Sequence, residues 1–338
     1  MSTIMHRIWS ERPIPSRLLP LLGDDVKVSG AARDTPDDPF EKLPGSHAVI
    51  AAAWIRYDAS FMDRVPTLRV ISRSGIGYDN IDVEVATARG VAVCNAPEAP
   101  SLATAEHTIA MMFAVTKHLK WADRALARGE VVDFFTLNRA VDITGRKLGL
   151  VGLGRIGGLV AGMASGLGMR VCAYDPYISA KRAEELGIER APSLDDLLSS
   201  ADVVSLHLPL TAKTRHLMNA ARLKQMKPQS YLVNCGRGPL VDEAALLEAL
   251  ESGHLSGAAL DVFEREPPPA DHPLLQRDDV IATPHIASAT AEGKDRLWQT
   301  AIVQAVQVLR GERPDHLVNP DVWHPADAGR GTEAVASD

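Results

Sequence analysis

Three polar residues in the second half of the chain have the types that acid and base chemistry on a small carboxylic acid requires. They are Arg237, between two glycines, Glu266, and His285, which follows a proline. Histidine exchanges a proton near neutral pH, and a carboxylate can orient its ring and favour its charged form. Arginine can hold a carboxylate through two parallel hydrogen bonds. We therefore expect His285 to be the acid and base, Glu266 to support it, and Arg237 to bind the substrate.

Each of the three also has a plainer interpretation. Arg237 fits a surface turn, Glu266 fits a solvated charge before three prolines, and His285 fits a buried, hydrogen-bonded histidine. For any one residue alone the plain interpretation is at least as good. The joint occurrence favours the catalytic hypothesis.

A glycine turn supplies the second chemical signal. An apolar run at 147–151 leads into Gly152, Gly154 and Gly157, and an apolar segment at 159–169 follows. In a strand, turn and helix of this kind the first glycine permits the turn, the second admits a pyrophosphate, and the third lets helix and strand pack closely. Such turns also occur for packing alone, so the pattern needs support from its surroundings.

That support comes from Asp175, which ends the apolar run 170–174 about 20 residues beyond the glycines, the spacing of a dinucleotide site. A carboxylate there accepts hydrogen bonds from the ribose hydroxyls and repels a 2′-phosphate. The alternative is a turn-capping aspartate before Pro176. The ribose interpretation predicts NAD as cofactor, and hence hydride transfer between nicotinamide and a carbonyl or hydroxyl carbon.

A metal centre is the other chemistry that scattered histidines suggest. Their spacing shows no H-E-x-x-H or comparable ligand pattern among His107, His118, His207, His216 and His285. We therefore expect no metal site.

The elements around these residues alternate between strand and helix, which indicates a parallel, doubly wound sheet. Further strands are expected at 202–206, 231–234, 258–260 and 280–283, with short helices after the caps Ser193 and Asp242 and at 223–226. Ligands bind at the carboxyl ends of such strands. That edge would collect the glycine turn, Asp175, His207 to Pro209, Cys235 to Gly238, Asp261 and His285.

The first hundred residues read as a smaller α/β unit. Strands are expected at 4–9, 48–55, 68–72 and 91–95, and a polar connection without regular structure joins the first two. Arg56 follows one of these strands, and another ends in the run Arg73, Ser74, Gly75, Ile76 and Gly77. Long helices are expected at 103–127 and 291–309. The residues from 325 onward lack apolar periodicity and predict a disordered tail.

The totals exclude some classes of function. The chain has 338 residues, a net charge of −7 and three widely spaced cysteines without a C-x-x-C pair. A chain of this length favours two domains. Its mildly acidic net charge argues against a nucleic-acid partner. The cysteine pattern favours a reducing, cytoplasmic compartment, and no segment has the composition of a signal peptide or a membrane span.

From about residue 48 to 318 the chain resembles the D-isomer-specific 2-hydroxyacid dehydrogenases. The resemblance rests on motifs in family order: Gly75 to Asp82, Ala105 to Thr108, the glycine turn, His207 to Thr211, Val233 to Gly238, Asp261 to Phe263 with Glu266 and Pro267, and Pro284 to Ser288. It implies a Rossmann-type doubly wound parallel sheet with a second, smaller flavodoxin-like α/β domain, and a dehydrogenase acting on a D-2-hydroxy acid or 2-oxo acid.

The resemblance also assigns residues. Arg237, Glu266 and His285 fall on the family's catalytic triad. The cofactor positions that it implies are Thr104, Gly152, Gly154, Arg155, Ile156, Gly157, Asp175, His207, Pro209, Cys235, Gly236, Asp261 and His285. Asp261 is expected near the carboxamide. Ile76 and Gly77 would present backbone N–H groups to the substrate carboxylate, beside Ser74, Gly75 and Arg237.

The family implies a discontinuous substrate domain, 1–102 plus 289–324, hinged near Pro100 and Ala289 to an NAD-binding domain at 103–288 that forms a homodimer. Arg56 and Arg73 resemble phosphate-site arginines, which favours 3-phosphoglycerate. Two departures weaken that substrate: Glu98, Ala99 and Pro100 replace an asparagine-containing loop, and a serine-binding regulatory domain is lacking. Hydroxypyruvate or glyoxylate reduction is the alternative, and a non-enzymatic NAD-sensing corepressor is a third.

Overall fold

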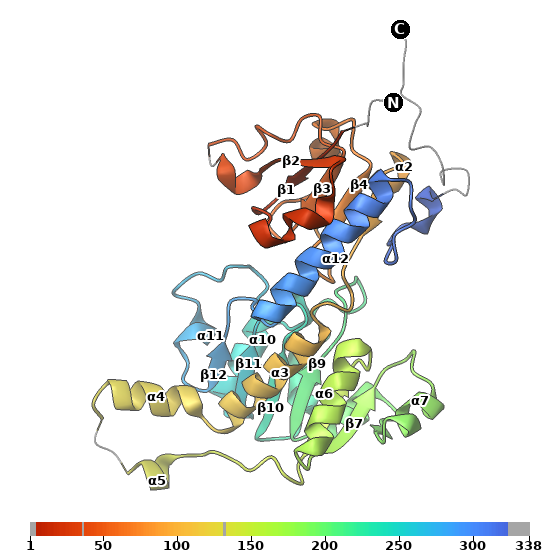
Figure 1. Ribbon diagram of the computed structural model, residues 1–338. Coiled ribbons are helices and arrows are strands. Elements are labelled where there is room, and N and C mark those ends of the chain that lie inside the picture. The colour runs from red at the N-terminus through yellow and green to blue at the C-terminus, as the bar shows by residue number, and fades with distance from the viewer. Residues whose placement is uncertain (1–4, 36, 131–132, 324–338) are drawn as a thin grey trace. The chain divides into compact units, whose positions relative to one another are not determined.

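The computed structural model describes residues 5–35, 37–130 and 133–323 and divides the chain into two compact units (Figure 1). Unit 1 comprises residues 1–100 and 291–338, and unit 2 comprises residues 101–290. The predicted disordered tail, 325–338, lies outside the described residues.

Unit 2 contains a seven-stranded sheet in the order β12-β11-β10-β9-β6-β7-β8, with every described pair parallel. The strands are β6 Lys147–Val151, β7 Arg170–Tyr174, β8 Glu189–Arg190, β9 Val203–Leu206, β10 Ser230–Asn234, β11 Leu255–Leu260 and β12 Val280–Ala282. The strand order reverses between β6 and β9. Ligands of doubly wound sheets bind at such a reversal.

Alternation along the strands buries both faces of this sheet. On β10, Tyr231 and Val233 belong to one apolar cluster and Leu232 to another. The first cluster contains residues of α3 (Ser101–Thr116) and α6 (Arg155–Gly166), and the second contains residues of α8 (Leu194–Ser200), α9 (Ala220–Gln225) and α10 (Glu243–Glu251). Helices therefore cover the sheet on both sides, as the sequence predicted.

Side-chain caps fix the starts of the short helices. Ser193 caps α8 by accepting from Asp196 N, and Asp242 caps α10 by accepting from Ala245 N, both as predicted. The helix predicted at 223–226 begins earlier, because Asn219 accepts from Arg222 N and starts α9 at Ala220.

The single helix predicted at 103–127 is wrong. Two helices occupy this stretch, α3 and α4 (Leu119–Ala127), and His118 between them has a left-handed φ of 52°. Neither glycine nor proline marks the break, so the local sequence gives no signal for it. Lys120 Nζ anchors α4 by donating to the carbonyl oxygens of Leu275, Arg277 and Val280 at 3.1, 2.7 and 2.8 Å.

Unit 1 contains a five-stranded parallel sheet in the order β2-β1-β3-β4-β5, the order of flavodoxin-like folds. The strands are β1 His6–Ser10, β2 Val26–Ala31, β3 Ala48–Ala51, β4 Val70–Arg73 and β5 Ala92–Cys94. The sequence prediction missed β2 and placed a connection there. The reason is composition, because only Val26 and Ala31 of this edge strand are buried.

One face of this sheet packs against α12 (Ala291–Leu309), which contributes Ala301, Ile302 and Ala305 to the core. The other face packs against α1 (Ala59–Asp63) and α2 (Val83–Ala88). The remaining helices are α5 Phe134–Leu137, α7 Ala180–Glu185 and α11 Pro273–Gln276, with 3-10 turns η1 Ser16–Leu22, η2 Ala32–Asp34, η3 Gly238–Leu240 and η4 Pro320–Val322. The predicted α/β fold class with two doubly wound sheets is confirmed.

Candidate functional site

Glu266 and His285 form a hydrogen-bonded pair in unit 2. Nδ1 of His285 lies 2.7 Å from Oε2 of Glu266, and the other carboxylate oxygen accepts from Phe263 N at 3.2 Å. With Nδ1 bound to a carboxylate, Nε2 is the ring atom available to a ligand. The His285 side chain is 40% exposed, so a ligand can reach it. The predicted pairing of these two residues is thus present in the structure.

Asp261 fixes the backbone that carries His285. Its side chain is fully buried and accepts from Thr283 Oγ1 at 2.5 Å and from the N–H groups of Ile286 and Ala287 at 2.9 Å each. Burial by itself would raise the pKa of Asp261, but hydrogen bonds from His107, Thr283 and the two amides outweigh it and lower the pKa. Asp261 is therefore an ionised anchor of the loop.

His107 completes this anchor from α3. Its Nε2 lies 3.1 Å from Thr283 Oγ1 and 3.5 Å from Asp261 Oδ1. The sequence analysis noted His107 within a motif but gave it no part in the site. The sequence feature that could have identified His107 is a histidine on a helix that packs against the carboxyl edge of the sheet.

Arg237 follows β10 on a braced loop. Asn234 donates from Nδ2 to Arg237 O at 2.9 Å and accepts from Gly236 N at 3.0 Å, and Arg237 Nη1 donates to Gly236 O at 2.8 Å. A side chain at Gly238 would meet the carbonyl group of Phe263 at 1.9 Å. The Arg237 loop therefore packs backbone to backbone on the segment that leads to Glu266, which requires glycine at 238.

The glycine turn has the geometry that a dinucleotide needs. Gly152 has φ 95°, and a side chain there would lie 2.5 Å from His207 O. A side chain at Gly157 would lie 2.4 Å from Gly152 O, whereas one at Gly154 meets nothing within 4 Å. Close packing thus fixes the first and third glycines, and open space surrounds the second at the N-terminus of α6. These residues fit a pyrophosphate.

Asp175 lies directly beside this turn. Its carboxylate accepts from Leu153 N and from Tyr177 N, each at 2.9 Å. The second bond is the turn-capping contact of the plain alternative, and the first ties the carboxylate to the glycine turn. Each oxygen keeps a second lone pair for a ribose hydroxyl.

His207 follows β9 on the other side of the strand reversal. Its Nε2 lies 2.9 Å from Ser205 Oγ, and burial lowers the pKa of His207 to about 4. The imidazole is therefore neutral at neutral pH. Pro209, in the same loop, accepts through its carbonyl oxygen from Thr214 Oγ1 at 2.7 Å.

The remaining predicted cofactor residues lie on three elements of unit 2. Arg155 and Ile156 form the first turn of α6, and Thr104 is buried in α3. Cys235 is buried at the end of β10, and burial raises the pKa of its thiol to about 12 in spite of a hydrogen bond with Thr108. The thiol of Cys235 is therefore protonated at neutral pH and is not a nucleophile.

The predicted substrate loop of unit 1 is braced on both sides. Ser74 N and Oγ both donate to Ala51 O at 2.9 Å, and Asn95 Nδ2 donates to Ile76 O at 2.8 Å. A side chain at Gly75 would lie 2.7 Å from Nη1 of Arg73, so the guanidinium lies against the loop backbone.

Among the residues that the structure describes, the N–H groups of Ile76 and Gly77 have no acceptor. They are available for an anion. Arg56, by contrast, extends into solvent, with 80% of its side chain exposed and Nε 3.7 Å from Asp58 Oδ2. A pair this exposed contributes little to stability.

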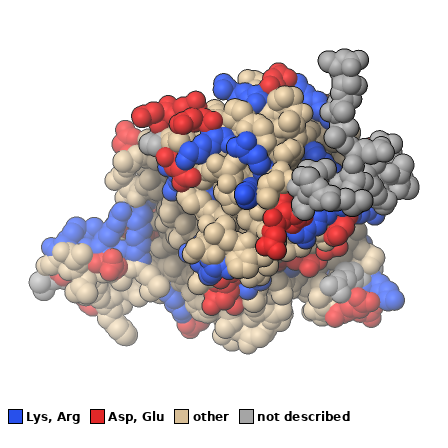
Figure 2. All heavy atoms as spheres, turned by 45° about the horizontal axis from the view of Figure 1, so that its top comes forward, with Lys and Arg blue, Asp and Glu red and all other residues tan. Residues whose placement is uncertain are grey.

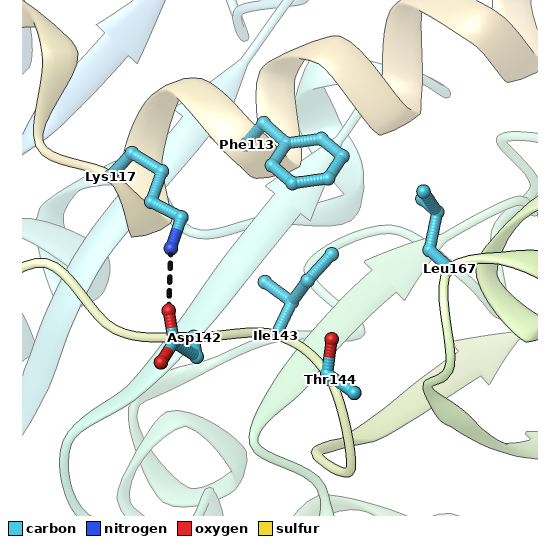
Figure 3. Close-up of a pocket in the computed structure, with 6 residues that line it drawn as sticks. All are labelled: Phe113, Lys117, Asp142, Ile143, Thr144 and Leu167. Atoms are coloured by element: carbon cyan, nitrogen blue, oxygen red, sulfur yellow. Dashed lines mark hydrogen bonds and ion pairs between the residues drawn. The ribbon is translucent and has the colours of Figure 1, made fainter.

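A pocket of about 400 Å³ lies elsewhere in unit 2 (Figure 3). It is lined by Phe113, Lys117, Asp142, Ile143, Thr144 and Leu167, and Lys117 pairs with Asp142 at 3.0 Å. Residues 142–144 precede β6 and Leu167 precedes β7, so the pocket opens at the amino edge of the sheet. None of the predicted site residues lines it.

The surface carries charges of both signs. Figure 2 shows groups of Lys and Arg and groups of Asp and Glu on the face that it presents. Within residues 5–35, 37–130 and 133–323, no helix is long and apolar enough to cross a membrane. In the same residues no group of three or more His, Cys, Asp or Glu side chains is arranged to hold a metal ion.

Comparison with known proteins gives the family. The model of the D-isomer specific 2-hydroxyacid dehydrogenase, NAD binding domain, matches residues 109–287. The chain is 38% identical to D-3-phosphoglycerate dehydrogenase of Methanocaldococcus jannaschii, over 93% of this chain and 60% of that protein. It is 37% identical to glyoxylate reductase of Korarchaeum cryptofilum, over 94% of this chain and 96% of that protein. The chain thus spans about three-fifths of the first relative's length.

A solved structure agrees. D-lactate dehydrogenase from Aquifex aeolicus, complexed with NAD and lactic acid, superposes with a TM-score of 0.81 at 29% identity, over 93% of this chain and 99% of that one. Fold, glycine turn and sequence similarity lead to the same conclusion. The chain belongs to the D-isomer specific 2-hydroxyacid dehydrogenase family, and residues 109–287 form the family's NAD-binding domain.

Proposed function

We propose that this protein is an NAD-dependent oxidoreductase that transfers a hydride between nicotinamide and a D-2-hydroxy acid or its 2-oxo acid. The 2.7 Å pair of His285 Nδ1 and Glu266 Oε2 is the observation that carries the proposal. It supplies an oriented imidazole whose second nitrogen is reachable, which general acid and base catalysis requires.

The residues divide the work as follows. Bound NAD supplies the acceptor or donor of the hydride. Arg237 holds the acid's carboxylate and polarises the neighbouring carbonyl. During reduction His285 donates a proton from Nε2 to the carbonyl oxygen, and Glu266 stabilises the imidazolium that the reaction needs. Asp261 and His107 keep the backbone of His285 in place. Reduction consumes a proton, so its rate falls and that of oxidation rises with increasing pH.

Two kinds of substrate have support, a phosphorylated acid and an unphosphorylated one. The identity to D-3-phosphoglycerate dehydrogenase and the arginines of unit 1 favour 3-phosphoglycerate. The 37% identity to glyoxylate reductase favours glyoxylate or hydroxypyruvate. Glyoxylate or hydroxypyruvate is therefore a full alternative to 3-phosphoglycerate.

We also propose a homodimer formed through unit 2. Large apolar side chains are exposed on α4 and α5: Leu119, Leu126, Phe135 and Leu137 are 53, 73, 98 and 52% exposed. Figure 1 shows both helices beyond β12 at one side of unit 2. Exposed apolar groups of this kind favour a protein partner, and a second copy is the simplest one. The three buried free thiols favour a cytoplasmic location.

The test is NADH oxidation by the purified protein with glyoxylate, pyruvate, hydroxypyruvate and 3-phosphohydroxypyruvate. We expect turnover with at least one acid and a loss of about 10³-fold or more in kcat for His285→Gln. His272→Gln is the matched control, because His272 forms a similar pair, 3.1 Å from Glu243, elsewhere in unit 2. Normal turnover by His285→Gln, or equal losses in the two variants, would reject the catalytic assignment.

A further inference from the structure

Two arginines stack on one exposed tryptophan in unit 1. The guanidinium carbons of Arg12 and Arg33 lie over the indole of Trp54, 3.9 and 4.1 Å from its centroid, and Trp54 is 55% exposed. Two like charges repel, so gathering them on one ring needs compensation. Cation–π attraction supplies part of it. An anion held by both arginines would supply the rest.

The loop that carries Trp54 is rigid. The buried carboxylate of Glu11 accepts from Ala52 N and Trp54 N at 2.7 Å each and from the hydroxyl of Tyr57 at 2.6 Å. From the other side, Asn80 Nδ2 donates to the carbonyl oxygens of Ala52 and Ile55. The position of the indole on which the two arginines stack is thus fixed. A fixed indole reduces the entropic cost of holding a ligand there.

The charge of Glu11 acts on Arg12 without a direct ion pair. Across the described part of the chain, no ion pair joins Arg12 or Arg33 to Asp or Glu. The neighbouring Glu11 already accepts three hydrogen bonds. Burial and, after it, the charge of Arg33 lower the pKa of Arg12. The two guanidinium groups therefore keep N–H donors for an anion.

Topology places this cluster beside the predicted carboxylate site of the same unit. Arg33, Arg12 and Trp54 follow β2, β1 and β3, and the loop with Ile76 and Gly77 follows β4. All four strands are parallel, so these loops lie along one edge in strand order. β1 lies two strand spacings, roughly 10 Å, from β4.

We propose that Arg12, Arg33 and Trp54 form a second anion subsite, which binds the distal carboxylate or phosphate of an extended 2-oxo acid. The proposal rests on the proposed function and narrows its substrate class. The loop after β4 holds the reacting end, and the stacked arginines bind an oxyanion at the far end through charge-assisted hydrogen bonds. Short monoacids such as glyoxylate and pyruvate do not reach the subsite.

The test compares kcat/KM for NADH-dependent reduction of pyruvate, 2-oxoglutarate and 3-phosphohydroxypyruvate. In the Arg12→Gln/Arg33→Gln variant we expect a loss of about 10- to 100-fold for an acid with a second anionic group and less than about twofold for pyruvate. Comparing the last two acids tells whether carboxylate or phosphate is preferred. Arg64→Gln is the control, since Arg64 also stacks on an aromatic ring of unit 1, Phe40, at 5.1 Å.

Equal losses for pyruvate and the extended acids would mean that the arginines only support the fold, and unchanged kinetics for every acid would also overturn the subsite. Calorimetric titration with inorganic phosphate separates this failure from a failure of the proposed function. Phosphate binding that the double variant loses, in a protein that reduces no 2-oxo acid, would keep the subsite and reject the dehydrogenase. Turnover that does not differ between pyruvate and the extended acids would keep the dehydrogenase and reject the subsite.

Discussion

The backbone N–H of His285 donates to the carbonyl oxygen of Asp261 at 2.7 Å, and His285 has a left-handed φ of 53°. A non-glycine residue in this region costs roughly 1 to 2 kcal/mol. Asp261 contributes both to this backbone bond and, through its carboxylate, to the loop that follows. Asp261 therefore contributes twice to holding His285 in this conformation, beside a second bond from His285 N to Thr283 O at 3.1 Å.

Replacing that carboxylate tests the anchor. In Asp261→Asn the amide nitrogen must replace one of the two carboxylate oxygens. It then faces either the Thr283 hydroxyl and the Ile286 N–H, which now bond Oδ1, or the Ala287 N–H, which bonds Oδ2. We expect the free energy of unfolding to fall by about 1 to 3 kcal/mol and activity to fall with it. Urea denaturation measures the first effect. Asp142→Asn, at a carboxylate that is 95% exposed, is the control and should change stability little.

The glycine turn allows a paired test of packing against ligand approach. Gly157→Ala puts a Cβ 2.4 Å from Gly152 O and should destabilise the protein by about 1 to 3 kcal/mol without NAD. Gly154→Ala meets nothing within 4 Å, so stability should stay within about 0.5 kcal/mol, whereas the Kd for NADH rises about tenfold or more. Thermal unfolding and NADH fluorescence titration measure the two effects. If both variants bound NADH as tightly as the unaltered protein, the assignment of this turn to NAD binding would be wrong.

His207 predicts a pH dependence of stability. Its pKa in the folded protein is about 4, below the ordinary 6.5, because it is buried. Between these values the unfolded chain binds a proton that the folded chain does not, so this contribution is present above pH 6.5 and is lost as the pH falls toward 4. His207 as a whole residue is only half-buried, which makes about 3 kcal/mol an upper limit.

The measurement is urea unfolding at several pH values in that window. His207→Gln should show a shallower loss of stability on acidification than the unaltered protein. His254→Gln removes a histidine bonded to the Met226 carbonyl and serves as the comparison. Parallel curves for the unaltered protein and His207→Gln would show that His207 does not titrate as described.

The three thiols should not react in the folded protein. Cys94, Cys172 and Cys235 are buried, and burial raises the pKa of both Cys94 and Cys235 to about 12. Because the thiolate is the reactive form, we expect an aromatic disulfide reagent to modify them only as fast as the protein unfolds. Absorbance with and without guanidinium measures this. Rapid modification of a thiol in native buffer would contradict the burial.

Prediction from sequence succeeded where each position follows a local rule. The strand periodicity, the caps Ser193 and Asp242 and the glycine spacing determine the sheet of unit 2 and its binding edge. The pair of Glu266 and His285 was predicted because a histidine that acts as acid and base needs a carboxylate to orient its ring and favour its charged form. These inferences depend on one segment or on the common edge of a parallel sheet.

It failed where partners distant in sequence decide. The helix break at His118 is fixed by contacts of α4 with residues 275–280, and no breaker residue announces it. Glu11 received no role in the sequence analysis, yet it holds a loop more than forty positions away. The edge strand β2 has too few buried residues for periodicity to reveal it.

The helix that closes the core of unit 1 is α12, the last α-helix among the residues that the structure describes. α12 supplies Ala301, Ile302 and Ala305 to the face formed by strands from the first hundred residues, and Asn319 accepts from Val93 N at 2.8 Å. During synthesis from the N-terminus, those five strands leave the ribosome with one face uncovered while all of unit 2 is still to be made. Unit 2 is contiguous and can complete its own core first. One face of the early sheet therefore stays uncovered until α12 is synthesised about 200 residues later. During that time the face is open to chaperones and to aggregation.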